Sequence, residues 1–217
     1  MDYHPTAEET STPSGYHHLG ATTGEQWSGV MGRLQVRDTG VRNGTYDFVA
    51  TRFLVKEYLP TGRIAWLEAG WSENGWHGDR QRIYTYDTNT NTWSFYDQYA
   101  LQEGTQVWIY LEAVANDPNG TWNAWLWWGD TWNLLASRAL PVGGQALIEE
   151  YVEIHVDSRY AGHIAVPHVL VDNVQLRGDD GSLRYWSSQI PTVTRSNVGG
   201  YCLTWQQLYD TFTAGSC

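Results

Sequence analysis

Residues 105–140 read TQVWIYLEAVANDPNGTWNAWLWWGDTWNLLASRAL, and this stretch decides the fold class of the chain. Three apolar and aromatic segments, 105–115, 120–129 and 131–140, are separated by the turn sequences Asp-Pro-Asn-Gly and Gly-Asp. Within the middle segment the large side chains alternate between two faces, because successive residues of a strand point to opposite sides of a sheet. Segments of this kind, closed by short turns, predict antiparallel strands.

The same pattern continues along the rest of the chain. Further strands are expected at 27–36, 46–59, 62–73, 80–88, 92–101, 146–157 and 167–178. A turn about every ten residues is typical of an all-β sandwich or barrel. A short polar and aromatic segment at 204–212 is the best candidate for a helix. We therefore expect one β domain over residues 25–217, with a C-terminal extension from about 179 to 217 and a flexible arm at residues 1–24.

The composition restricts the class of partner. The chain has 217 residues with 24 acidic and 13 basic side chains, which gives a formal net charge of -11. Such a balance disfavours binding to nucleic acid or to an anionic membrane surface. The sequence contains no apolar run of the roughly 18 residues that a membrane-spanning helix needs. The oligomeric state cannot be read from these features.

Two cysteines, Cys202 and Cys217, lie close together near the C-terminus. An even, closely spaced pair in an otherwise cysteine-free chain predicts one disulfide that closes a terminal loop, and with it an extracellular location. The spacing does not match a zinc or redox motif. Two free thiols are the alternative.

A glutamate interrupts the aromatic strand at 62–73. Glutamate is a poor strand residue, and a buried charge costs several kcal/mol unless it is paired. By alternation Glu68 shares a face with Trp66, whereas Trp71 lies on the opposite face. The carboxylate is therefore exposed to solvent, paired, or used in chemistry.

The strand expected at 146–157 carries a second unusual set of polar and ionisable side chains on one face. Glu149, Tyr151, Glu153 and His155 point to one side, so three ionisable groups share one face. One interpretation is an exposed polar face, and the other is a polar cleft. If Glu68 and Glu153 meet there, their mutual repulsion raises one pKa, and the pair can act as general acid and general base. Peptide hydrolysis and glycoside hydrolysis both use such a pair, and the residues alone do not separate them.

At this point the chain resembles a known family. The segments LEAGWSENGWHGDRQRIYTYDT (67–88), WNAWLWWGDTWNLL (122–135) and LIEEYVEIHVDS (147–158) are similar to motifs of neprosin-type glutamic endopeptidases. EQWSGVMGRLQV (25–36) is similar to the first strand of neprosins and of the related eqolisins. The chain departs from the family at Tyr151-Val152, where neprosins usually have Gly-Gly before the second glutamate.

The resemblance implies a two-sheet antiparallel, concanavalin-like (jelly-roll) sandwich and a secreted endopeptidase that is active at acid pH and, in neprosins proper, cleaves after proline. It places Glu68 and Glu153 at the two catalytic glutamates. We expect a polypeptide substrate, no cofactor and no metal. The candidate substrate-binding residues are Trp66, Trp71, Trp127, Tyr151 and His155.

The tryptophans leave a second function open. The chain has 13 of them, and most are expected in the core between the sheets. Aromatic rings in a groove of an acidic β-sandwich also suit stacking against sugars. A non-catalytic carbohydrate-binding module, or a structural extracellular subunit, is therefore the alternative to an enzyme.

Overall fold

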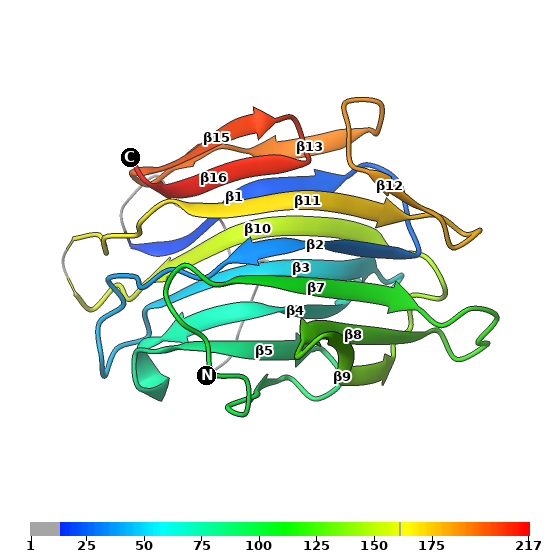
Figure 1. Cartoon of the computed structure of the whole chain (residues 1–217), viewed down its shortest axis with the longest axis horizontal. Helices are drawn as coiled ribbons and strands as arrows, with labels where there is room; N and C mark the ends of the chain where they lie inside the picture. The colour runs from blue at the N-terminus through cyan, green and yellow to red at the C-terminus, as the bar shows by residue number, and fades with distance from the viewer. Residues whose placement is uncertain (1–13, 161) are drawn as a thin grey trace.

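The structure of the protein, a computed structural model, describes residues 14–160 and 162–217. Two antiparallel sheets pack face to face along their length (Figure 1). The one helical element in these ranges is a 3-10 turn, η1, at Gly75–His77. The prediction of an all-β, two-sheet antiparallel sandwich is confirmed. No helix in the described ranges is long and apolar enough to span a bilayer.

The first sheet has seven strands in the order β13-β1-β10-β3-β4-β5-β6. Its strands are β13 (Thr192–Arg195), β1 (Gly15–Thr23), β10 (Leu147–Val156), β3 (Phe48–Tyr58), β4 (Ile64–Asn74), β5 (Gln81–Asp87) and β6 (Thr92–Phe95). Neighbours in this sheet are often far apart in the sequence, so distant segments meet on its faces.

The second sheet has nine strands, eight of them in the order β14-β15-β16-β11-β2-β7-β8-β9, with β12 paired to β11. Its strands are β14 (Asn197–Val198), β15 (Tyr201–Gln207), β16 (Thr211–Ser216), β11 (Val169–Arg177), β2 (Gly29–Gln35), β7 (Gln106–Ala113), β8 (Thr121–Trp128), β9 (Thr131–Ala139) and β12 (Leu183–Tyr185). The three segments within 105–140 form β7, β8 and β9, as the sequence predicts.

Apolar side chains from both sheets fill the space between them. In β8, Trp122, Ala124 and Leu126 point inward and are fully buried, which is the alternation expected of a half-buried strand. The central strands of the seven-stranded sheet are buried on both faces. A second apolar cluster covers part of the outer face of this sheet and contains Phe48, Ala50, Leu54, Trp66, Tyr84 and Tyr86. The site described below lies beside this cluster.

The expected flexible arm requires a correction. Residues 1–13 lie outside the described residues, but Gly15–Thr23 form β1, which pairs with β10 on one side and β13 on the other. His17 and His18, which belong to this segment, are buried. A segment of glycine, histidine and threonine has a weak strand signal, and the two partner strands hold it in place through backbone pairing.

The C-terminal region also differs from expectation. The segment expected to be helical, 204–212, belongs instead to the antiparallel pair β15 and β16. β13 joins the seven-stranded sheet, and β12, β14, β15 and β16 join the other, so residues 179–217 are built into the sandwich. Pairing across the turn supplies the hydrogen bonds that a short helix would have formed locally.

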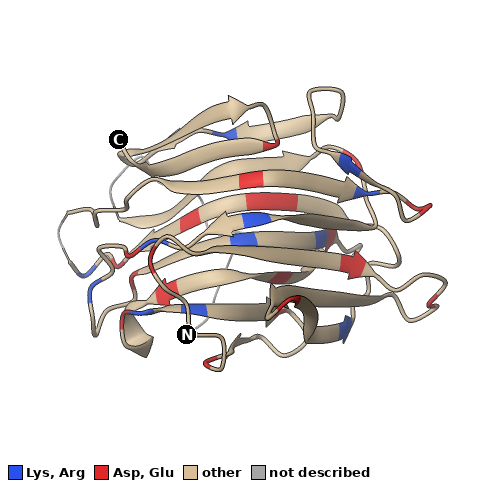
Figure 2. Cartoon of the chain, in the orientation of Figure 1, with Lys and Arg blue, Asp and Glu red and all other residues tan. Residues whose placement is uncertain are grey.

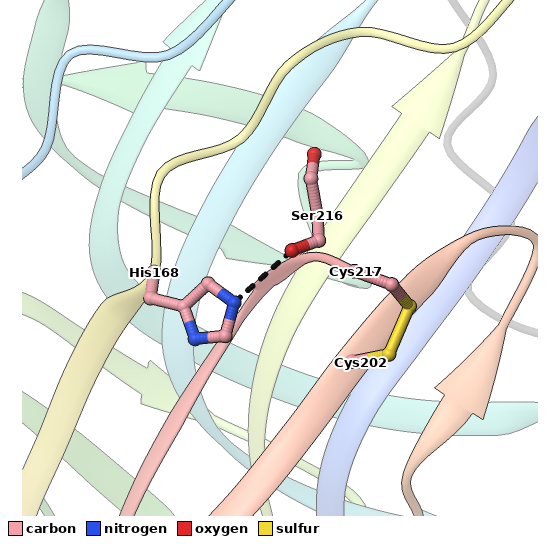
Figure 3. The surroundings of a disulfide bond; sticks show 4 residues. All are labelled: His168, Cys202, Ser216 and Cys217. Carbon is pink, nitrogen blue, oxygen red and sulfur yellow. Dashed lines mark hydrogen bonds between the residues drawn. A yellow bond between two sulfur atoms is a disulfide. The ribbon is translucent and has the colours of Figure 1, made fainter.

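Cys202 and Cys217 form a disulfide, as their spacing predicts. The bond joins β15 to the residue that follows β16, and the backbone N–H of Cys217 donates to the carbonyl of Gly200 at 3.0 Å. Figure 3 shows His168 beside this bond, with its Nε2 3.0 Å from the carbonyl oxygen of Ser216. The end of the chain is therefore fixed by both covalent and hydrogen bonds.

Candidate active site

The predicted glutamates lie on the outer face of the seven-stranded sheet. In the strand register, Leu54 of β3 stands opposite Glu149 of β10 on one side and opposite Glu68 of β4 on the other. Residues directly opposite each other share a face, and Glu153 lies four residues after Glu149 on the same face. Acidic and basic positions accordingly lie close together on these central strands (Figure 2).

A guanidinium group joins the three carboxylates. Nε and Nη2 of Arg52, on β3, each lie 2.9 Å from Oε2 of Glu153, and Nε donates a hydrogen bond to it. The same Nε is 3.5 Å from Oε2 of Glu68, and Nη1 is 3.2 Å from Oε2 of Glu149. The planar fork of arginine suits carboxylates on several sides. Arg52 is therefore the centre of the site.

These distances bring the predicted pair together. Because Oε2 of Glu68 and Oε2 of Glu153 both approach one nitrogen of Arg52, their separation cannot exceed the sum of 3.5 and 2.9 Å. A single water molecule can bridge carboxylates at such a distance. The two side chains share a face and a cation, which is a geometry that general acid and base chemistry can use.

Burial makes Glu68 an unusually weak acid. Its side chain has no exposed surface, and this desolvation is the main cause that raises its pKa to about 8. Arg52 opposes the shift, and the negative charge of Glu153 adds to it. Tyr84 donates a hydrogen bond of 3.0 Å to Oε1 of Glu68, and burial raises the pKa of this phenol as well. Glu68 therefore holds its proton through neutral pH.

Glu149 behaves in the opposite way. Burial acts to raise its pKa, but Lys56 and Arg52 outweigh that effect, and the pKa is lowered. Lys56 forms an ion pair with Glu149, and Thr22 hydrogen-bonds Oε1 of the same carboxylate at 3.4 Å. Glu149 is an ionised structural partner of Arg52 and Lys56, whereas Glu68 is protonated.

The β1 strand contributes a histidine to the site. His18 stands opposite Glu153 in the register, and its Nε2 lies 3.5 Å from Oε1 of that residue. The ring also contacts Tyr151 edge-on, with centroids 5.5 Å apart. The sequence predicts a flexible arm at residues 1–24, so this contact was not expected.

Three of the predicted substrate-binding residues border the glutamates. Trp66 is 7% exposed and stacks on Tyr86, while Tyr151 is 5% exposed and hydrogen-bonds the hydroxyl of Thr22 at 2.8 Å. His155 stacks on Phe48, and its Nδ1 lies 2.6 Å from the carbonyl of Tyr46. These residues occupy the rim of the site.

Trp71 and Trp127 do not lie at this site, and their expected positions are corrected. Trp71 is fully buried in the core between the sheets, where its indole N–H donates to the carbonyl of Gln35 at 3.0 Å. Its place in β4 puts it on the face opposite Glu68. Trp127 belongs to β8 in the nine-stranded sheet and is 40% exposed on its outer face.

Arg52 and Tyr84 are the main residues of the site that were not predicted from the sequence. Arg52 stands in an apolar strand just as Glu68 does, and this similarity is the signal that could have indicated an ion pair. Tyr84 gives no such signal, since tyrosine is common in strands. In the described ranges no group of three or more His, Cys, Asp and Glu side chains is placed to hold a metal ion.

Comparison with known proteins defines the fold class. No protein-family model matches the chain, and no curated protein matches it significantly. A crystal structure of scytalido-glutamic peptidase with a transition state analog inhibitor is similar, with a TM-score of 0.63 and 13% identity over 93% of this chain and 98% of that one. A second structure of that peptidase, with a peptide based transition state analog, gives a TM-score of 0.61 and 13% identity, covering 94% and 98%. The chain thus has the fold of a glutamic peptidase.

Proposed function

We propose that this protein is a secreted, cofactor-free glutamic endopeptidase in which Glu68 and Glu153 act as an acid and base pair. The observation that carries the proposal is the approach of both carboxyl groups to Arg52, with Glu68 protonated through burial. The likeness of the whole fold to a glutamic peptidase supports peptide hydrolysis over glycoside hydrolysis. The disulfide supports an extracellular location.

In the first step Glu153 is the general base. The two N–H groups of Arg52 favour its carboxylate form, which accepts a proton from a water molecule as the water oxygen bonds to the peptide carbonyl carbon. Glu68 donates its proton to the carbonyl oxygen. Because Tyr84 donates to Oε1 of Glu68, the proton of Glu68 resides on Oε2, the oxygen on the side of Arg52.

In the second step the tetrahedral intermediate breaks down. Glu153, which now carries the proton from water, transfers it to the amide nitrogen as the carbon–nitrogen bond breaks. One hydroxyl proton of the intermediate returns to Glu68, and the pair regains its starting state. No covalent enzyme intermediate is formed, and no metal or cofactor enters the cycle.

Substrate must enter past the rim, since Glu68 and Glu153 have no exposed surface. Trp66 and Tyr151 on the rim, and His18 beside Glu153, retain a small exposed fraction. A proline side chain packs well against aromatic rings, which fits the resemblance to proline-directed peptidases. We therefore propose that Trp66 and Tyr151 contact the residues next to the scissile bond.

A digestion experiment tests the proposal. The protein is incubated with reduced, denatured casein between pH 3 and pH 8, and the fragments are identified by mass spectrometry. We expect peptides with proline enriched before the cleaved bond. Glu68→Gln and Glu153→Gln are expected to remove cleavage, because each retains the shape of the side chain but cannot exchange the proton.

Glu25→Gln is the matched control, since Glu25 is exposed and remote from the pair. It should cleave as the unaltered protein does. Circular dichroism is recorded on each variant to verify folding. Cleavage that persists in folded Glu68→Gln would remove the proposed role of the pair.

A further inference from the structure

A hollow lined by tryptophans lies on the other sheet. Trp108 of β7 pairs with Trp127 of β8, which in turn pairs with Trp132 of β9, so three indole rings occupy one cross-strand row. Together with Met31 of β2 they line a hollow of about 330 Å³ on the outer face of the nine-stranded sheet. This volume is at the lower end of the range for small-ligand sites. The glutamate pair belongs to the opposite sheet.

The three tryptophans present ring faces and indole N–H groups to the hollow. Trp127 and Trp132 meet nearly at right angles, at 74° with centroids 5.5 Å apart, and the guanidinium of Arg33 lies 5.7 Å from the ring centroid of Trp108. Trp127 remains 40% exposed. The indole N–H groups of these three tryptophans make no hydrogen bond to any described residue, so each can donate to a ligand.

Two charged residues on the same face as the hollow, Arg33 and Glu112, are each paired with a neighbour. Arg33 binds both carboxylate oxygens of Asp172, at 2.8 and 2.6 Å. Glu112 lies 3.8 Å from Arg177 and accepts hydrogen bonds from Tyr110 and from the indole of Trp125. The four lining residues themselves therefore present aromatic faces, a thioether and neutral indole donors.

We propose that this hollow binds a neutral oligosaccharide. A pyranose ring has a face of C–H groups, which carry partial positive charge and stack on the negative face of an aromatic ring. Its hydroxyl groups can accept hydrogen bonds from the indole N–H groups. The exposed rings and the unused donors fit these two needs together.

A polypeptide fits the hollow less well. Extended peptides bind largely through main-chain hydrogen bonds at the edge of a sheet. β2, β7 and β8, which carry three of the four lining residues, are each paired on both sides, so their backbone groups are used within the sheet. Within these three strands the donors that remain are side chains, which suit a sugar, although β9, which carries Trp132, is the edge strand of the sheet.

The site is independent of the glutamate pair, and the two can be tested apart. Hexasaccharides of β-1,4-glucose, β-1,3-glucose, β-1,4-mannose, β-1,4-xylose and β-1,4-N-acetylglucosamine are titrated into the protein by calorimetry. We expect at least one to bind. Trp127→Ala and Trp132→Ala should weaken binding by about tenfold or more, because each removes a stacking face.

Two controls complete the design. Tyr185→Ala removes an aromatic ring that is 53% exposed and does not line the hollow, and it should bind as the unaltered protein does. Glu68→Gln should also bind normally, whatever its effect on cleavage. Thermal unfolding verifies that each variant is folded.

The proposal is overturned if no hexasaccharide binds. It is equally overturned if sugar binding is unchanged in both folded tryptophan variants. A proline decapeptide is titrated in parallel. If it binds through Trp127 and Trp132 while every sugar fails, the hollow is a peptide site instead.

Discussion

Arg52 donates from Nε to Oε2 of Glu153 at 2.9 Å, and both side chains are fully buried. Two further carboxyl groups, those of Glu68 and Glu149, approach the same guanidinium. One arginine and Lys56 thus face three acids. The local charge balances when Glu68 holds its proton, which agrees with its raised pKa.

Replacing Arg52 should lower the stability of the fold. In Arg52→Gln the ionised carboxylates of Glu149 and Glu153 lose their shared cation, and removing one partner of a buried pair typically costs about 3–5 kcal/mol. We expect the free energy of unfolding, measured in urea at pH 7, to fall by that amount. At pH 4 the loss should be smaller, because carboxylates can then take up protons.

Arg80→Gln provides the comparison for that experiment. Arg80 pairs with Asp97, but both side chains are more than half exposed, so the loss should remain below about 1 kcal/mol. If Arg52→Gln does not fold alone, Arg52→Gln combined with Glu153→Gln removes the charge that was held by Arg52 and should recover stability, whereas Glu149 keeps its ion pair with Lys56. Equal losses for Arg52→Gln at pH 4 and pH 7 would contradict an electrostatic role.

The pH dependence of cleavage should report the pKa of Glu68, the proposed acid of the pair. Glu68 must be protonated to act, and its pKa is raised to about 8, so we expect kcat/KM to decline only as the pH approaches that value. The hydrogen bond from Tyr84 lowers the pKa of Glu68. Tyr84→Phe removes it and should move this decline to higher pH by about one unit.

Tyr96→Phe is the matched control for the pH profile. Tyr96 also hydrogen-bonds through its hydroxyl, to Thr85 and to the carbonyl of Leu135, but it does not contact the glutamates. Its loss should lower stability and leave the pH profile unchanged. A decline at the same pH in Tyr84→Phe and the unaltered protein would argue against Glu68 as the acid.

The sequence predicts much of the fold because alternation is a local property. The stretch at 105–140 identifies three strands, and the same rule places Glu68 with Trp66 and Glu149 with Glu153 on their faces. It also placed Trp71 opposite Glu68, so its burial in the core follows from the pattern. β1 was missed because it carries few apolar residues, of which Leu19 and Ala21 pack into the core, and its place depends on pairing with β10 and β13.

Only some of the residues that meet at the site could be predicted from the sequence. β10, β3 and β4 are neighbours in the sheet although β10 is far from the others in sequence, and Arg52 meets the glutamates only through that order. No local rule gives the order of strands. Likewise, Trp127 was assigned to the wrong site because alternation does not reveal to which sheet a strand belongs.

The disulfide should contribute to stability. Cys202 and Cys217 are separated by 15 residues, and closing a loop of that size is worth about 3 kcal/mol in the chain-entropy model. The paired strands β15 and β16 already hold these ends close together, so we expect a loss of about 2–3 kcal/mol for Cys202→Ser with Cys217→Ser. Urea unfolding measures it, and an unchanged midpoint would show that strand pairing alone fixes the terminus.

A buried acid in the core between the sheets should make the fold more stable in mild acid. Glu150 of β10 is fully buried, and neither of its carboxyl oxygens has a hydrogen-bond partner among the described residues. Desolvation, and to a lesser degree the charge of Asp210, raise its pKa well above the usual value. The pKa of Asp210 is raised as well, mainly by burial.

The direction in which stability changes with pH follows from the number of protons bound by the folded and the unfolded chain. Above the ordinary pKa of about 4.5 the unfolded chain loses its proton while folded Glu150 retains it, so stability falls with rising pH by about 1.4 kcal/mol per unit until its raised pKa is reached. Asp47 and Asp157 act oppositely: their pKa values are lowered, and their contribution is lost as the pH falls below about 4. We therefore expect the melting temperature to be highest between about pH 4 and pH 5.

Glu150→Gln tests the origin of this optimum. The amide cannot ionise, so the decline in melting temperature between pH 5 and pH 8 should become shallower, while the decline below pH 4 should remain. Glu25→Gln changes an exposed acid and should leave the whole curve in place. If the decline from pH 5 to pH 8 in Glu150→Gln matches that of the unaltered protein, Glu150 does not set the acid stability of the fold.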